Sequence, residues 1–500
     1  MNIIKSNFLV ALVLIPILGY GSALMPNEVQ KRPKNVVLML IDDLGYGDLG
    51  AHGNPVIKTP NMDALHNESV RFTNFAVSPT CAPTRAALLT GRHEFKSEVT
   101  HTLHNMNNLS LEATTIADLF QRKGFATGMF GKWHVGQGGK HGPWFRGFDE
   151  TLTVPYDEQN SHFNPRLLKN RKPTEFKGYR TNILFDEAMT FIENNKDKPF
   201  FCYLPTYSPH TPLKVPKKYS QPYEGIKGMT YECADKNGLG SNHVNFCGMV
   251  ANVDENVGRL MSKLESLNLT ENTLIILISD NGATFGIDIT NAGMRGAKAG
   301  AWRGGTRAVS LWKYGSKFPA GDRGQMTGHV DVFSTLADLF NLDVDEKLAS
   351  QLDGDSLQPL LKDAKATLEG ERMQVHHRGR WADPAVWARH KYTHCLVRWK
   401  NYQLVRVEPC DVGKCCHIII NRGTQKRRPY YTGNFEHYQL TKPGQWELYN
   451  IIDDPHQDRD IAAENPEVVQ RMVNFYENWW EDVSPTLEAM AAKATDKGNE

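Results

Sequence analysis

Two kinds of apolar pattern alternate along the first 360 residues. Short continuous apolar runs are typical of buried strands, whereas apolar residues spaced by three and four positions are typical of helices. The predicted strands are 35–41, 125–130, 199–204 and 274–278. The predicted helices are 112–123, 246–264 and 330–340. This alternation predicts an α/β domain with a large mixed, mostly parallel sheet sandwiched by helices.

The pattern changes near residue 370. Short aromatic and basic segments within 374–407, followed by 446–449, predict a smaller antiparallel sheet. Asn465 and Pro466 are typical of a helix start, and the residues after them carry one apolar face. We therefore expect a large α/β domain at 24–370, an α+β subdomain at 371–490 and a flexible tail at 491–500.

The N-terminal residues are typical of a secretory signal peptide. Lys5 gives a positive start, 8–18 is apolar, and 21–23 are small residues suited to cleavage. The alternative is a buried N-terminal helix. The apolar run is too short to span a bilayer, and no later segment is apolar enough to do so. We expect residues 1–23 to be removed and the protein to be secreted or periplasmic.

Composition and charge narrow the class of protein. Five hundred residues exceed one comfortable core, and 40% hydrophobic with 23% charged residues is typical of a soluble globular protein. The formal net charge is +1, so nucleic acid and anionic membranes are excluded as bulk partners. A local basic site for an anion stays open.

Eight cysteines bear on the redox chemistry, and export permits disulfides. They are Cys81, Cys202, Cys233, Cys247, Cys395, Cys410, Cys415 and Cys416. A bridge between Cys233 and Cys247 would cross a loop rich in Gly and Asn, and the 410–416 cluster has the cysteines for a second bridge. If Cys81 is modified, an odd number remains, so at least one is free or pairs outside the chain. Metal–thiolate binding is the weaker alternative, because no Cys-x-x-Cys spacing occurs.

Polar pairs follow two of the predicted strands. Asp42 and Asp43 come after the first strand, and Asp280 and Asn281 follow 274–278. Ligand sites of parallel sheets form at the carboxyl ends of the strands, and oxygen-bearing side chains suit a hard cation such as Ca²⁺ or Mg²⁺. Either pair alone fits a turn or a helix cap.

A further motif lies at 78–92, where Cys-Ala-Pro-Thr-Arg at 81–85 precedes a helix opening and Thr-Gly-Arg. A single cysteine there is more often a small apolar residue or half of a disulfide. Other motifs lie on both sides of it along the chain, at 35–50, 59–75, 131–136, 146–149, 208–212, 279–282, 352–357 and 446–455. Together they resemble the type I, formylglycine-dependent sulfatases of the alkaline phosphatase superfamily. The resemblance spans roughly residues 34–362, with a weaker match beyond.

The resemblance implies a role for each site residue. A formylglycine-generating enzyme would oxidise Cys81 to formylglycine (3-oxoalanine), whose hydrate attacks sulfur. The implied metal ligands are Asp42, Asp43, Asp280, Asn281 and the modified Cys81. Their oxygen-only ligation favours Ca²⁺ over Mg²⁺. Arg85 would stabilise the hydrate oxygen, while Lys132 and Lys298 would hold the sulfate oxygens.

Two histidines complete the implied mechanism. His210 would protonate or polarise the leaving alcohol, which leaves a sulfated hemiacetal. His134 would then remove a proton from the second hydroxyl, so that sulfate is expelled and the aldehyde is restored. Lys132 and His134 lie two positions apart, so on an extended segment their side chains point the same way. Outside this context, His134 and His210 would be ordinary polar loop residues.

The implied activity is hydrolysis of sulfuric esters, and a sulfated carbohydrate, such as an algal or glycosaminoglycan fragment, is the favoured substrate. Within 374–381, Trp381 is a candidate to stack on a sugar, and Arg378 and Arg380 to pair with sulfate or uronate. A surface strand with solvated charges fits the same residues. At 302–305 the chain has Trp-Arg-Gly-Gly where this family often has an aromatic-Glu-Gly-Gly turn. The reversed charge at Arg303 would change turn contacts or favour an anionic substrate.

Other functions stay open at this stage. Small aryl sulfates are an alternative substrate class, and phosphoester or phosphonate hydrolases of the same superfamily share parts of this site. Comparing sulfate and phosphate esters of one alcohol separates these activities. A non-catalytic sulfated-glycan-binding relative would bind without releasing sulfate, and a structural surface protein would need no such site.

Overall fold

The computed structural model describes residues 32–103, 105–136, 138–155, 161–226, 240–381, 383–407 and 444–496. Residues 33–500 form one compact unit, to which all elements below belong. The expected signal peptide lies outside the described residues, as do Cys233, Cys410, Cys415 and Cys416. Cys247 is a free, buried thiol. Within the described ranges, every helix falls short of the length and apolar character that a membrane crossing requires.

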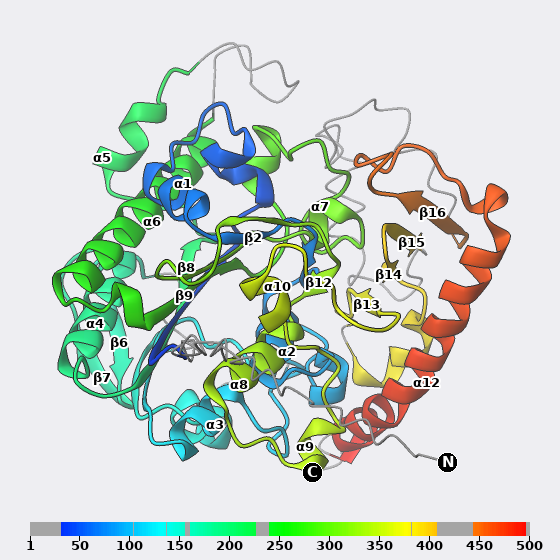
Figure 1. The fold of residues 1–500 in the computed structure, drawn as a ribbon, viewed down its shortest axis with the longest axis horizontal. Coiled ribbons are helices and arrows are strands. Elements are labelled where there is room, and N and C mark those ends of the chain that lie inside the picture. The colour runs from blue at the N-terminus through cyan, green and yellow to red at the C-terminus, as the bar shows by residue number, and fades with distance from the viewer. Residues whose placement is uncertain are drawn as a thin grey trace, which may run out of the picture. The chain divides into compact units, whose positions relative to one another are not determined.

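A ten-stranded sheet forms the centre of the unit, in the order β11-β2-β10-β9-β1-β8-β4-β5-β6-β7 (Figure 1). Its strands are β1 (Asn35–Asp42), β2 (Val70–Phe72), β4 (Ala126–Gly131), β5 (Glu150–Thr153), β6 (Arg166–Lys169), β7 (Lys172–Glu175), β8 (Phe200–Pro209), β9 (Thr273–Ser279), β10 (Ser310–Tyr314) and β11 (Gly321–Arg323). The run β9-β1-β8-β4-β5 is parallel, and β10, β6 and β7 pair antiparallel to their inner neighbours. The predicted mixed, mostly parallel sheet is confirmed.

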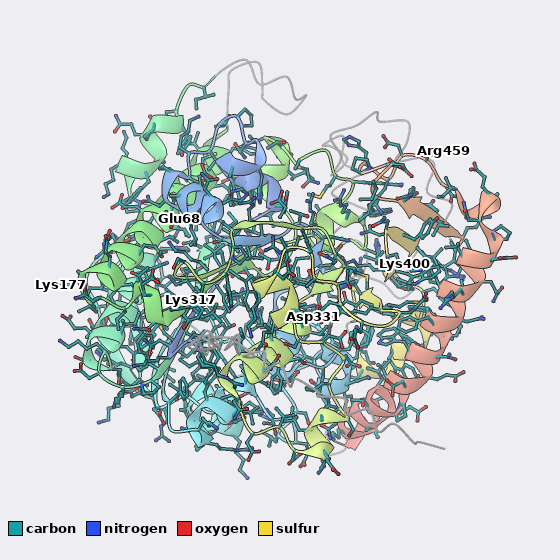
Figure 2. All side chains as sticks on the ribbon, in the orientation of Figure 1. Glu68, Lys177, Lys317, Asp331, Lys400 and Arg459 are labelled. Atoms are coloured by element: carbon teal, nitrogen blue, oxygen red, sulfur yellow. The ribbon has the colours of Figure 1, made fainter. Side chains whose placement is uncertain are left out.

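Helices cover both faces of this sheet because its central strands are apolar on both sides. Val36, Leu38 and Leu40 of β1 share a core with helices α2, α3 and α8, whereas Val37 and Met39 pack with α1, α4 and α6. The helices are α1 (Pro60–Asn67), α2 (Cys81–Thr90), α3 (Ile116–Arg122), α4 (Arg180–Asn194), α5 (Lys217–Ser220), α6 (Ser241–Ser266), α7 (Arg303–Thr306), α8 (Asp331–Phe340), α9 (Glu346–Ala349) and α10 (Gln358–Lys362). Lys177, Lys400 and Arg459 are exposed (Figure 2), while Asp331 is buried beside Arg372.

The start of helix α3 and the end of strand β8 differ from the predicted bounds by four and five residues. Helix α3 begins at Ile116, because Thr115 accepts a hydrogen bond from the Asp118 amide and the Asp118 carboxylate accepts one from the Thr115 amide. This capping box fixes the first turn, so the predicted start at Glu112 is wrong. Strand β8 continues to Pro209 rather than ending at Leu204, which brings the strand to the edge where the candidate site lies.

A second, four-stranded antiparallel sheet packs against helix α12 (Pro466–Asp496; Figure 1). Its strands are β13 (Met373–His377), β14 (Cys395–Trp399), β15 (Tyr402–Arg406) and β16 (Trp446–Asn450), and a two-stranded pair, β3 (Phe75–Ala76) with β12 (Thr327–Gly328), lies apart. The predicted smaller sheet and the helix start at Pro466 are confirmed. The helix runs through 491–496, the first part of the expected tail.

The core beneath α12 contains residues from outside the second sheet. Phe95 and Met106 join Trp381, Met472 and Tyr476 in one buried cluster. Trp381 is 1% exposed and packs 5.3 Å, ring centre to ring centre, from Phe95, and Arg378 is also 1% exposed. Our interpretation of Trp381 and Arg378 as surface contacts for a sugar is therefore wrong, because both side chains are buried in the protein interior.

His377 lies in the same core, and its hydrogen bonds specify a neutral ring. Its Nε2 donates to the carbonyls of His390 and Lys391, and its Nδ1 accepts from the Gly379 amide. Burial lowers the pKa of His377 to about 3. A second proton on Nδ1 would break the Gly379 bond, so the folded protein resists protonation.

We predict that the free energy of unfolding decreases as pH falls, and that His377 accounts for part of this decrease. The unfolded chain binds a proton at this residue below about pH 6.5, while the folded chain does not until about pH 3. Stability is therefore complete above the first value and is lost as pH falls toward the second, by about 1.4 kcal/mol per pH unit. Chemical unfolding at several pH values measures this slope. The His377→Gln variant should have a shallower slope, and an unchanged slope would contradict the prediction.

Candidate active site

The two polar pairs predicted from the sequence meet at one edge of the large sheet. Strands β1 and β9 are parallel neighbours with Ile41 opposite Ser279, so Asp42, Asp43, Asp280 and Asn281 follow at the same level. The Asp43 amide donates to Asp280 Oδ1 at 3.2 Å, and Asn281 Nδ2 donates to Asp43 Oδ1 at 3.0 Å. All four side chains are buried. Neither pair serves merely as an exposed turn.

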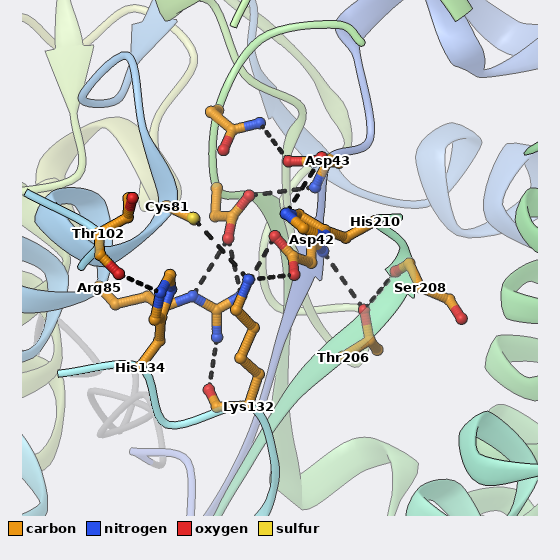
Figure 3. A network of polar contacts seen from close by, with 12 residues as sticks. Asp42, Asp43, Cys81, Arg85, Thr102, Lys132, His134, Thr206, Ser208 and His210 are labelled. Carbon is orange, nitrogen blue, oxygen red and sulfur yellow. Dashed lines mark hydrogen bonds and ion pairs between the residues drawn. The ribbon is translucent and has the colours of Figure 1, made fainter. Parts of the chain in front are cut away.

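Cys81 lies beside these side chains as the first residue of α2 (Figure 3). Thr80 is extended before the helix, and Pro83 falls within the first turn, where a proline needs no backbone donor. Ligand atoms of Asp42, Cys81 and Asp280 lie within 4.8 Å of one another. Burial raises the pKa of the Cys81 thiol, but the Lys132 ammonium, whose Nζ lies 3.8 Å from Sγ, and that of Lys298 outweigh burial and lower it.

Arg85, one turn along α2, is fully buried and pairs with Asp280. Its Nε and Nη2 lie 3.1 and 2.7 Å from Asp280 Oδ2, and its Nη1 donates to the Lys132 carbonyl at 2.6 Å. Burial, together with the negative charge of neighbouring Asp42, raises the pKa of Asp280 well above its usual range. Arg85 therefore holds both a candidate metal ligand and the backbone that carries Lys132.

Two lysines reach the same edge from different segments. Lys132 follows β4 and places Nζ 2.6 Å from Asp42 Oδ2, and Lys298 Nζ contacts Asp43 Oδ1. Burial opposes charge on Asp42, but Lys132, His210 and Arg85 together lower its pKa well below the usual range. Gly131 precedes Lys132 with φ of +145°, and a Cβ there would lie 1.8 Å from the Pro205 carbonyl oxygen. Only glycine allows this approach of β4 to β8.

His134 is partly buried beside Lys132 and Arg85, and its tautomer is fixed. The Thr102 carbonyl, which can only accept, lies 3.0 Å from Nε2, so Nε2 carries the proton. Nδ1 is buried and has no hydrogen-bond partner in the described ranges. Burial and the nearby Lys132 and Arg85 charges lower the pKa of His134 well below its usual value. His134 has φ of +65°, so the expectation of an extended segment is wrong, although the ring reaches the site.

His210 follows β8 and is the most open member of the cluster. Its side chain is 33% exposed, Nε2 lies 3.8 Å from Asp43 Oδ2, and Nδ1 lies 2.6 Å from the Thr211 carbonyl. That carbonyl fixes a proton on Nδ1, so Nε2 is the atom that faces the site. Burial lowers the pKa of His210, against the attraction of Asp43.

The arrangement fits a hard divalent cation. Asp42 Oδ1 and Asn281 Oδ1 are buried and have no hydrogen-bond partner among the described residues. Such oxygens rarely stay unsatisfied in a folded protein, and two of them beside a carboxylate cluster form an oxygen-rich donor set. The Cys81 sulfur would be replaced by an oxygen after conversion to formylglycine, which makes the set wholly oxygen.

Arg303, which departs from the family pattern, lies away from this cluster of ligands. Its backbone amide donates to Gln457 Oε1 at 2.8 Å, and its Nη1 donates to the Pro455 carbonyl at 3.2 Å. Burial and the neighbouring Arg307 lower its pKa to about 9. The sequence predicted either changed turn contacts or a preference for an anionic substrate. The structure supports changed turn contacts, because Arg303 hydrogen-bonds the α7 turn to the loop after β16.

Asn107 is a site residue that sequence reasoning missed. Its Nδ2 donates to the His134 carbonyl at 3.1 Å, which supports the unusual backbone conformation of that residue. The segment around Asn107 has neither helical nor strand periodicity and no charged pair, so it carries no signal in a single sequence.

A nucleophile position on a helix N-terminus, a buried acidic cluster and two lysines define a hydrolase site for an anionic ester. The Sulfatase family model matches residues 34–342. The chain belongs to the sulfatase family, the type I sulfatases of the alkaline phosphatase superfamily, and is a sulfuric ester hydrolase.

Individual relatives extend this comparison along the chain. An N-acetylgalactosamine-6-O-sulfatase of Bacteroides thetaiotaomicron is 26% identical over 90% of this chain and 94% of its own. Human arylsulfatase A is 31% identical over 66% of this chain and 68% of its own. The solved structure of Ps i-CgsB in complex with k-i-k-neocarrahexaose matches 90% of this chain and 93% of its own, with a TM-score of 0.72 and 26% identity.

Proposed function

We propose that this protein is an exported sulfatase that removes sulfate esters from carbohydrates. The observation that carries the proposal is the meeting of Asp42, Cys81 and Asp280 within 4.8 Å, with Lys132 Nζ 3.8 Å from the sulfur. Among the relatives above, one is named for N-acetylgalactosamine-6-sulfate removal and one was solved with neocarrahexaose, which supports a carbohydrate substrate. Export rests on the signal peptide expected at 1–23.

Cys81 is proposed to be converted to formylglycine by a formylglycine-generating enzyme. The hydrate of this side chain supplies a nucleophilic hydroxyl for sulfur and a second hydroxyl through which sulfate can later be expelled. Residue 81 begins a helix, where the aligned backbone dipoles favour negative charge on that oxygen.

Asp42, Asp43, Asp280 and Asn281 are proposed to hold Ca²⁺ together with residue 81. The bound cation would supply Lewis-acid stabilisation of negative charge on the sulfate oxygens. Lys132 and Lys298 now contact Asp42 and Asp43, and they are placed to bind those oxygens as well. Arg85 is proposed to act on the hydrate oxygen only indirectly, since its guanidinium is occupied by Asp280 and the Lys132 carbonyl.

The two histidines have separate proton tasks in this proposal. His134 presents an unprotonated Nδ1, which suits a base that removes the proton from the second hydroxyl. His210 Nε2 faces the site at its open side, and the doubly protonated ring, which the adjacent Asp43 carboxylate favours, would transfer its Nε2 proton to the departing alcohol. The lowered pKa of His134 keeps it unprotonated at neutral pH, as a base requires.

Sulfate release from sulfated oligosaccharides, before and after chelation, tests this proposal. Protein produced together with a formylglycine-generating enzyme should release sulfate, and removal of divalent metal should lower kcat/KM by roughly 100-fold or more, which several kcal/mol of transition-state stabilisation implies. Added Ca²⁺ should restore the rate better than Mg²⁺. Unchanged turnover in protein shown to be metal-free would contradict the metal role, and release from no sulfate ester would contradict the function.

A further inference from the structure

A cavity of about 110 Å³ opens beside Lys132 and His134. Ligand pockets for drug-sized molecules are roughly 300–1,000 Å³, so this cavity has room for one sugar ring rather than a run of rings. It is formed by the segment after β4, the turn at Pro143–Phe145 and strands β5 and β6. Because Lys132, one of the two lysines proposed to bind sulfate, lines this cavity, the group that carries the ester would lie in it.

The walls of the cavity are of two kinds. Trp144, Val154 and Leu168 supply apolar surface, and Asn107 and Tyr207 supply polar groups. The Trp144 ring packs closely against Gly142: a Cβ on that glycine would lie 2.5 Å from the ring, so a larger residue at 142 would displace it. A sugar ring has one apolar face of C–H groups and a rim of hydroxyls, and an aromatic ring beside polar groups matches both.

Asn107 adds an unsatisfied acceptor beside the cavity. Its Nδ2 faces the His134 carbonyl, which can only accept, so Oδ1 is the atom turned away from that bond. Oδ1 is buried and has no hydrogen-bond partner among the described residues, and Asn107 itself is 2% exposed. A buried acceptor of this kind is satisfied by a donor such as a sugar hydroxyl or amide.

Permanent charge is scarce among the described residues that line the cavity. Among the described residues that line it, Lys132 alone carries a full charge, and Asp42 already neutralises it. Arg180 stacks on the Tyr207 ring at 4.4 Å but is 2% exposed and does not line the cavity. A carboxylate or a second sulfate on the bound ring would therefore lose water without gaining a counter-charge.

We infer that this cavity selects a sugar ring that is neutral apart from the sulfate being removed, a hexose or N-acetylhexosamine rather than a uronic acid or a multiply sulfated ring. This inference rests on the proposed function. Trp144 is the specificity-determining residue that packs on the ring, and Asn107 accepts a hydrogen bond from it. Leu168 lies opposite Thr153 in the β5–β6 pair. A cationic side chain at this position would reduce the preference for neutral rings over acidic ones.

Paired substitutions at Trp144 and Phe145 test the ring contact. Phe145 is the neighbouring aromatic residue, is 56% exposed and does not line the cavity. With a monosulfated galactose as substrate, Trp144→Ala should raise KM about 10- to 100-fold, and Phe145→Ala should change it less than about 2-fold. Thermal unfolding of both variants checks that each is folded. Equal effects of the two substitutions, or no effect at Trp144, would overturn the inference.

A substrate panel tests the charge preference and separates it from the proposed function. Wild-type protein should cleave monosulfated galactose and N-acetylgalactosamine at least about tenfold more efficiently than sulfated iduronate or a disulfated hexosamine, and Leu168→Arg should narrow that ratio. Nitrophenyl sulfate reports the sulfatase chemistry without a sugar. If nitrophenyl sulfate is hydrolysed and the acidic sugars are cleaved as well as the neutral ones, this inference alone fails. If no sulfate ester is hydrolysed, the proposed function fails.

Discussion

Replacing Cys81 with serine is expected to stop sulfate turnover after one event per molecule, with a fall in the steady-state rate of roughly four orders of magnitude or more. A serine hydroxyl at this helix N-terminus can still attack sulfur: its proton passes to a carboxylate of the adjacent acidic cluster as the O–S bond forms. The bond from sulfur to the alcohol then breaks, and the alcohol takes the Nε2 proton of a doubly protonated His210. The resulting serine sulfate has no second hydroxyl from which sulfate can be expelled. Lys132 and the acidic cluster stay in place, so the fold should survive.

Stoichiometry and mass measure this result. The Cys81→Ser variant should release one alcohol per protein and gain the mass of one sulfuryl group on the peptide containing residue 81. Cys202 is the matched control, because it is also a fully buried free thiol but lies within β8, where burial raises its pKa. Cys202→Ser should retain turnover. Wild-type turnover by the Cys81→Ser variant, or an unmodified Cys81 in fully active protein, would refute the formylglycine mechanism.

Replacing Arg85 with alanine should lower the free energy of unfolding by about 3–5 kcal/mol and abolish activity. The side chains of Arg85 and Asp280 are both fully buried, and their closest contact is 2.7 Å. Loss of the guanidinium leaves a carboxylate without its partner in a site closed to water, and it frees the Lys132 carbonyl that the guanidinium holds at 2.6 Å. Urea unfolding at neutral pH, without added Ca²⁺, measures the change.

The exposed Arg259–Asp186 pair provides a control of the same chemistry. Its atoms lie 2.5 Å apart, but its side chains are 41% and 51% exposed, so Arg259→Ala should cost less than about 1 kcal/mol. A double variant, Arg85→Leu with Asp280→Asn, should recover much of the lost stability but none of the activity, because it removes the buried charge together with its partner. A cost at Arg85 no larger than at Arg259 would contradict our account of the site.

The parts of this protein that the sequence predicts well are those set by local pattern. Strands β1 and β9 are continuous apolar runs that end in acidic or amide residues, and the α6 stripe repeats at helical spacing, so pattern alone locates them. Because parallel strands end at a common edge, the meeting of Asp42 with Asp280 also follows from the sequence.

The errors concern features decided by tertiary contacts. Trp381 lies in an aromatic and basic segment typical of a surface sugar contact. It is buried beneath α12 because it packs with residues far away in the chain, such as Phe95 and Met472. The backbone of His134 is left-handed, and the Asn107 side chain binds its carbonyl, a contact between segments without periodicity.

The shared core of Phe95 and Met106 with α12 has a consequence for how this protein evolves. The segment that bears Phe95 follows directly after α2, the helix that begins with Cys81, and Phe95 packs 5.8 Å, ring centre to ring centre, from Trp479 of α12. Replacing α12 with the corresponding helix of another sulfatase would therefore disrupt the packing around Phe95. Recombination that imported a foreign helix would need matching changes beside the nucleophile, which ties diversification of the tail to that of the catalytic half.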